Sequence, residues 1–193
     1  MTVANTPIKI CSRASLLIGG DAIQSFSDGS AEATVANAMY EDMAQAALTN
    51  SRWRFATDQA VLNRLANAPT GRYDAAYQLP SECIMLNAVT VNDHPIKYDT
   101  YGSKVYVDAS ANEELIADYT FRADESTWPP YFIVAVEYVM AGVLAASVAR
   151  DAQLSNMMES KANILMAQAR RLDSQTQTNR KLNTSRFIAQ RRS

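Results

Sequence analysis

Apolar residues recur at helical spacing in four stretches, two near the N-terminus and two in the last third of the chain. In the first stretch, Ile10, Ala14, Leu17 and Ile18 lie three or four positions apart and are followed by a Gly-Gly pair that can end a helix. The same spacing appears in the other three stretches, with alanine frequent in the second. The pattern therefore predicts helices over about 10–19, 31–50, 131–149 and 152–174.

Between about residues 54 and 121 the chain changes to short runs rich in Val, Ile and Tyr, separated by turn residues. The runs "CIMLNAVTVN", "IKYD", "KVYVD" and "LIADYTF" alternate with "NDHP", "TYGS" and "ASANEE". These runs predict three or four strands in an antiparallel meander, with "IKYD" and "KVYVD" forming a hairpin across the glycine turn. The expected fold is mainly helical α+β. A four-helix bundle-like body (1–174) carries an inserted small β-meander and is followed by an extended C-terminal arm (175–193).

The helical stretch over residues 131–149 is apolar almost all round and is about as long as a membrane span. It contains Glu137 near its middle, is rich in weakly apolar alanine, and is the single such stretch in the chain. These properties favour a buried central helix of a soluble protein, with no membrane as partner.

Charge is distributed unevenly along the chain. Residues 170–193 carry seven basic side chains and one acidic, a net +6, whereas the other 169 residues carry 11 basic and 19 acidic, a net −8. The last part of this basic stretch also holds an apolar pair, Phe187-Ile188. An acidic body with a basic end is typical of a protein that binds a partner through a tail.

Residues suited to catalysis or metal binding are few and scattered. His94 is the only histidine and lies in a turn, and Cys11 and Cys83 are far apart, which favours reduced, buried thiols. The paired carboxylates Glu113-Glu114 lie in a loop and are expected to be solvated. No phosphate-binding glycine loop is present. The sequence therefore predicts a protein that is not an enzyme and that needs no cofactor or metal.

The segment "SRWRFA", residues 51–56, has two interpretations. Arginines interleaved with Trp53 and Phe55 can stack on nucleic-acid bases. Alternatively, the two aromatic rings anchor the end of the second helix against the core while the arginines face solvent. We favour the second interpretation.

The order of several segments resembles the tail tubular protein A family of short-tailed bacteriophages, which are head-to-tail adaptors. The similar segments are Ile18 to Asp21, Phe26 to Ala33, the helix that leads into "SRWRFAT", "YQLPSE", and the helix opened by Pro129. Together they cover most of residues 10–172. No fixed family pattern matches the C-terminal "NTSRFIAQRRS".

The resemblance implies a non-catalytic virion protein at the head-tail junction, made in the host cytoplasm. Such proteins form a ring, typically of twelve copies, beneath the portal protein. They connect the portal to the tail nozzle and surround double-stranded DNA, which passes through without specific binding.

Three sets of residues are the candidates for these contacts. The stripe of the last helix, expected to meet a neighbouring subunit or the portal, contains Leu154, Met157, Met158 and Lys161. The candidates for the tail or a neighbour, in the meander, are Tyr98, Tyr101, Lys104 and Tyr106. The portal-binding candidates in the arm are Arg186, Phe187, Ile188, Arg191 and Arg192. Three alternatives stay open: a nucleic-acid-binding protein that uses its basic tail, a tail that only confers solubility, and an enzyme with an unfamiliar site.

Overall fold

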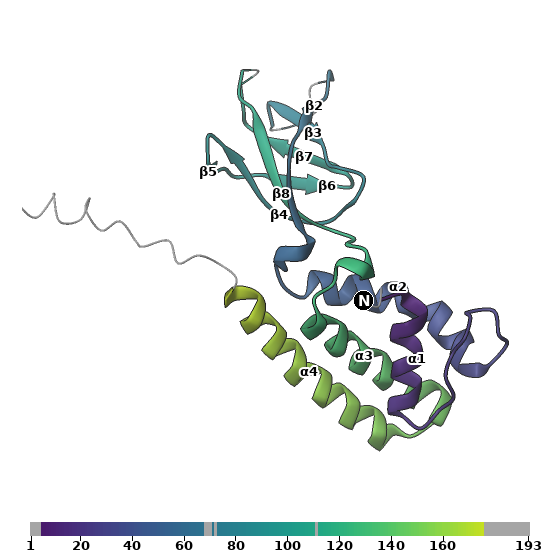
Figure 1. Cartoon of the computed structure of the whole chain (residues 1–193). Coiled ribbons are helices and arrows are strands. Elements are labelled where there is room, and N and C mark those ends of the chain that lie inside the picture. The colour runs from purple at the N-terminus through teal and green to yellow at the C-terminus, as the bar shows by residue number, and fades with distance from the viewer. Residues whose placement is uncertain (1–4, 68–70, 72, 111, 176–193) are drawn as a thin grey trace, which may run out of the picture.

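The protein has a mixed α+β fold in which a helical part and a β part lie at opposite ends (Figure 1). The computed structural model describes residues 5–67, 71, 73–110 and 112–175. The helices are α1 (Pro7–Leu17), α2 (Ala31–Thr49), α3 (Pro130–Leu144) and α4 (Ala152–Gln175), with short helices at Arg54–Ala56, Glu125–Thr127 and Ala145–Ala149. The strands are β1 (Thr57–Val61), β2 (Asn63–Arg64), β3 (Ala75–Gln78), β4 (Cys83–Val91), β5 (His94–Pro95), β6 (Asp99–Tyr101), β7 (Lys104–Val107) and β8 (Leu115–Phe121).

Helix α1 begins three residues earlier than its apolar spacing predicts. The Thr6 side chain accepts a hydrogen bond from the backbone N–H of Lys9 at 3.3 Å, and Pro7 occupies the first helical position. Both features stabilise a helix start. At the other end, Gly19 has φ +79° and the N–H of Gly20 donates to the Ser15 carbonyl at 3.0 Å. This six-residue closure is a Schellman motif, and it confirms the predicted glycine stop.

Helix α2 matches its predicted range to within one residue at its C-terminal end. The Ser30 hydroxyl accepts a hydrogen bond from the N–H of Ala33 at 3.1 Å, and Glu32 lies in the first turn. Asp28 accepts hydrogen bonds from both the backbone N–H and the hydroxyl of Ser30. The polar turn before the helix is therefore also its cap.

The predicted helix over 131–149 is an α-helix followed by a π-helical turn. Pro130 stands at its start, and α3 runs to Leu144 before the chain widens into the π-helix Ala145–Ala149. Arg150 then adopts φ +53°, which ends the helix, and Asp151 accepts hydrogen bonds from the first backbone N–H groups of α4. The turn between α3 and α4 is thus short, and the two helices lie antiparallel against each other (Figure 1).

The strands form two antiparallel sheets, which corrects the prediction of a single meander. One sheet has the order β1-β8-β4-β5 and the other β2-β3-β7-β6. In the first sheet, the last strand, β8, lies between β1 and β4, so sequential strands are not simply neighbours. A second hydrophobic core lies among the strands, with Val89, Val105, Val107 and Leu115 fully buried. This core contains residues from both sheets, so the two sheets pack against each other instead of forming one continuous meander.

The predicted hairpin forms across the glycine turn, but its first strand is Asp99–Tyr101, so the first three residues of "IKYD" lie outside the strands. β6 pairs with β7 in the register Tyr101 opposite Lys104, which leaves Gly102 and Ser103 as a two-residue turn, with Gly102 at φ +59°. A positive φ at the first turn position matches the right-handed twist of the flanking strands. The "NDHP" turn likewise places Asn92 and Asp93 at positive φ between β4 and β5.

The helical core is built around the ring of Phe132 on α3. The centroids of the Trp53, Phe55 and Trp128 rings each lie 4.9 to 6.0 Å from a neighbouring ring in this cluster, and Phe132 is 4.9 Å from all three. Trp53 is fully buried and its indole N–H donates to the Ala47 carbonyl at 2.9 Å. The aromatic residues of "SRWRFA" therefore anchor the end of α2, as we favoured.

The segment Pro130–Ala149 is long and apolar enough to cross a membrane, yet 56% of its most apolar window is buried inside the protein. α3 contacts α1, α2 and α4. Glu137 is 8% exposed and accepts a hydrogen bond from Arg13 of α1 at 2.8 Å. A buried charge must be paired, so the bond to Arg13 allows Glu137 to lie inside the helical core.

A polar network joins the helical part to the β part. The Arg122 guanidinium, just after β8, bonds Glu41 at 2.9 and 3.0 Å and Glu125 at 2.5 Å. Glu125 is 6% exposed and also accepts a hydrogen bond from the Tyr40 hydroxyl at 2.9 Å. Burial raises the pKa of Tyr40, and the Glu125 carboxylate beside it raises this pKa further. The two carboxylates raise the pKa of Arg122, although burial alone would lower it.

Candidate functional site

Helix α4 is held on the protein by a narrow face on which three small residues are interspersed with two methionines and an aspartate. The buried members are Ser155, Met158, Ala162, Met166, Ala169 and Asp173. The Ser155 hydroxyl donates to the Gly142 carbonyl of α3 at 3.0 Å, and a Cβ added at Gly142 would lie 3.1 Å from the Glu159 side chain. Small residues at this contact allow the two helix backbones to approach closely.

The outer side of α4 carries large apolar residues that are about half exposed. Met157 is 57% exposed, Ile164 54% and Leu172 45%. Lys161 and Gln168 lie between them and are also exposed. We call these five residues the α4 face. Their spacing of three or four positions makes a continuous stripe along the helix, and such a stripe on a surface is typical of a protein contact.

The α4 face differs from the predicted stripe at two positions. Met158 is 8% exposed and belongs to the helical core, and Leu154 is half-buried against it, whereas Met157 and Lys161 are exposed. The prediction followed the largest apolar side chains, but the buried side of α4 is centred on Ser155, Ala162 and Ala169. The stripe is therefore rotated away from the buried side, and Met158 is not a contact residue.

This difference predicts opposite outcomes for two neighbouring substitutions. Met158→Glu places a carboxylate in the core, so we expect it to destabilise the protein by several kcal/mol and lower its melting temperature. Met157→Glu lies on the surface and should change stability by no more than about 0.5 kcal/mol. Circular dichroism melting of the two purified variants measures both effects. Equal melting temperatures would contradict the assignment of the two side chains.

The tyrosines predicted to form an adhesive surface on the β part lie on two different sides. Tyr101 and Lys104 are exposed, and the half-buried ring of Tyr106 lies against Tyr101, with ring centroids 5.4 Å apart in an edge-to-face arrangement. Tyr73 lies 6.1 Å from Tyr106 and extends this surface. Tyr98 instead packs against the core among the strands. The tyrosine face is therefore Tyr73, Tyr101, Lys104 and Tyr106, which corrects the prediction for Tyr98.

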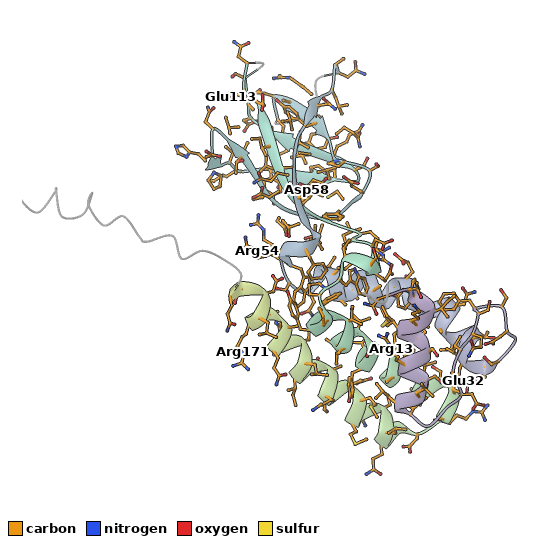
Figure 2. All side chains as sticks on the ribbon, in the orientation of Figure 1. Arg13, Glu32, Arg54, Asp58, Glu113 and Arg171 are labelled. Carbon is orange, nitrogen blue, oxygen red and sulfur yellow. The ribbon has the colours of Figure 1, made fainter. Side chains whose placement is uncertain are left out.

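A groove of about 650 Å³ lies where the end of α4 meets β1 and the turn after α2. Asp118 is bound there by Arg52 at 2.7 Å and by the Gln59 side chain at 2.5 Å. Asp173 accepts hydrogen bonds from the Arg54 backbone N–H at 3.1 Å and the Tyr131 hydroxyl at 3.0 Å. Figure 2 shows Arg54 and Asp58 beside this junction. Three arginines and three aspartates line the groove, and among them Arg52 and Asp118 form an ion pair.

The candidate residues of the C-terminal arm, Arg186, Phe187, Ile188, Arg191 and Arg192, lie outside the described residues. Gln175 is the last described residue and ends α4.

The side chains considered for chemistry are placed as follows. Cys11 is buried, and burial raises its pKa to about 12. Cys83 is half-buried with a raised pKa, also from burial, and His94 is exposed. Among the described residues, no group of three or more His, Cys, Asp or Glu side chains is placed to hold a metal ion.

Comparison with known proteins adds no family to this description. No protein-family model matches the sequence, and no curated protein is detectably similar to it.

Proposed function

We propose that this protein is a head-to-tail adaptor of a short-tailed bacteriophage, a structural protein without catalytic activity. Copies of the chain form a ring, typically a dodecamer, beneath the portal protein and link it to the tail nozzle. The ring surrounds the channel through which double-stranded DNA passes without specific binding. The observation that carries this proposal is the ordered resemblance of segments over most of residues 10–172.

The positions of the resembling segments in the fold support the proposal. "IGGD" contains the glycine stop of α1, "FSDGSAEA" contains the cap of α2, and "SRWRFAT" and "WPPYF" supply the aromatic core around Phe132. Residues that set helix ends and core packing are those that related proteins share most readily. In this proposal, helices α1–α4 form a bundle-like body, from which the β part projects as the inserted element.

Each candidate surface has a role in the proposed assembly. The α4 face contacts a neighbouring subunit or the portal, and the tyrosine face contacts the tail component or a neighbour. The C-terminal arm binds the portal, with Phe187 and Ile188 in an apolar pocket and the arginines around it paired with carboxylates. The protein is made in the host cytoplasm and resides at the head-tail junction of the virion.

Binding of the full chain to a purified portal ring tests this function. We expect Phe187→Ala to weaken binding more than Arg191→Ala does, because burial of a large apolar side chain contributes about 1.5–3 kcal/mol and an exposed ion pair about 0–1 kcal/mol. The loss should persist at high salt, and deletion of residues 183–193 should abolish docking while the circular dichroism spectrum is retained. Co-sedimentation at low and high salt measures these effects. A chain that never binds the portal contradicts the proposed function.

The alternative function, nucleic-acid binding through the tail, is favoured by one observation. Residues 176–193 hold five basic and no acidic side chains, and Arg170 and Arg171 precede them at the exposed end of α4. This alternative requires affinity for free duplex DNA that falls steeply with salt, with a slope set by about six charges. Portal binding that vanishes at modest salt and survives Phe187→Ala would favour it.

A further inference from the structure

Helix α2 presents an exposed face that is the chemical opposite of the α4 face. Its central exposed members, which we call the α2 face, are Ala31, Thr34, Ala38, Asp42, Gln45 and Ala46, and Asn37 and Glu41 are exposed at its edge. These side chains are small or polar and follow one side of the helix. Alanines on a helix surface leave shallow grooves, into which the larger side chains of another helix can insert.

The charges of the two faces are also opposite. Helix α2 contains three acidic and no basic residues, Glu32, Glu41 and Asp42. The exposed charged residues of α4 are Lys161, Arg170, Arg171 and one acid, Glu159, while the buried Asp173 is already bonded within the chain. The carboxylate of Asp42 and the ammonium of Lys161 make no hydrogen bond or ion pair with any residue that the structure describes. Both are therefore free to bind a partner.

The two faces do not meet within one copy. α3 contacts both helices, and Figure 2 shows Arg171 of α4 and Glu32 of α2 at opposite sides of the helical part. A contact between two different faces that point in different directions is head-to-tail, and it generates a ring when the rotation closes. An α4–α4 contact would instead use the same face on both copies and end at a dimer.

We propose that the α4 face of one copy docks on the α2 face of the next copy. Met157, Ile164 and Leu172 insert between the small residues of α2, and Lys161 approaches Asp42. Glu41 is not used, because it binds Arg122 of its own chain at 2.9 Å. This inference deepens the proposed function, on whose ring it rests, by naming the two faces that form the ring contact.

Charge reversal with complementation tests the pairing. Asp42→Lys and Lys161→Glu each place like charges at every contact, so the concentration at half-assembly should rise about tenfold or more. A 1:1 mixture of the two variants restores opposite charges at every contact of an alternating ring, and the double variant restores them in one chain. Both should assemble like the unchanged protein. Sedimentation velocity of the full chain, alone and with a purified portal, measures assembly.

The matched control is Glu114→Lys, which makes the same charge change at an exposed position in the β part. It should leave assembly unchanged, and circular dichroism should show that every variant keeps its fold. Single variants that assemble normally, or a mixture no better than either single variant, overturn the pairing of these faces. If rings still form on the portal in that case, the proposed function stands without this inference. If the single variants lose assembly and the mixture and the double variant regain it, but the rings do not bind a portal, the inference stands and the adaptor function fails. A chain that stays monomeric under all conditions overturns both.

Discussion

Phe132→Ala is expected to lower the free energy of unfolding by about 3–5 kcal/mol, the largest single loss that the structure predicts. The Phe132 side chain is fully buried, and its ring lies 4.9 Å from each of three other aromatic rings. Two of these rings, Trp53 and Phe55, come from the turn after α2, and Trp128 comes from the segment after β8, while Phe132 itself lies on α3. Removing the central ring therefore leaves a cavity among three segments that cannot easily collapse.

Val134→Ala is the matched control, because Val134 lies two positions along the same helix and is 39% exposed. It should cost about 0.5 kcal/mol or less. Urea unfolding followed by tryptophan fluorescence measures both variants, since Trp53 and Trp128 report directly on the cluster. A loss below about 1 kcal/mol for Phe132→Ala would show that this cluster is not the centre of the core.

Glu125→Ala is expected to cost about 3 kcal/mol, at the low end of the range for a broken buried ion pair because Arg122 keeps Glu41 as a partner. The substitution also leaves the buried Tyr40 hydroxyl without its acceptor. Glu41→Ala removes the other carboxylate of the network, whose side chain is 53% exposed, and should cost only about 0–1 kcal/mol. Thermal unfolding of the two variants compares them. Equal losses of stability would mean that the buried Glu125 contributes no more to the Arg122 network than the exposed Glu41 does.

The helix ranges followed from the sequence because their signals are local. The cap residue Ser30, the stop at Gly19 and the prolines before α3 each act on the adjacent turn, so they can be identified without knowledge of the fold. The start of α1 was predicted three residues late, although its signal, Thr6 followed by Pro7, is just as local. The prediction was based on the apolar repeat, which starts at Ile10, and the capping signal lies before that repeat.

The β part and the contact faces depend on packing between distant residues. β1 reads "TDQAV" and is polar on most of its length, because it is an edge strand. Its pairing with β8 joins Thr57 to Thr120, a contact that no short sequence window contains. Met158 was assigned to the exposed stripe for a similar reason. Close packing against Gly142 places small residues such as Ser155 on the buried side, so the largest apolar side chains do not mark which side of α4 is buried. The Arg122 network likewise joins residues that are far apart in the chain.

The pairing of β1 with β8 also bears on how the protein can change over evolution. The chain leaves the helical part at Thr57 and returns at Thr120, and these residues lie directly opposite each other on adjacent strands. Adjacent strands are about 4.7–4.9 Å apart, so the two points where the chain enters and leaves the β part stay this short distance apart whatever lies between these two residues. Hairpins can therefore lengthen, shorten or be exchanged at the far end of the sheets without altering the positions of α2 and α3. Such an arrangement lets the far end of the β part change in sequence and length while the helical part stays constant.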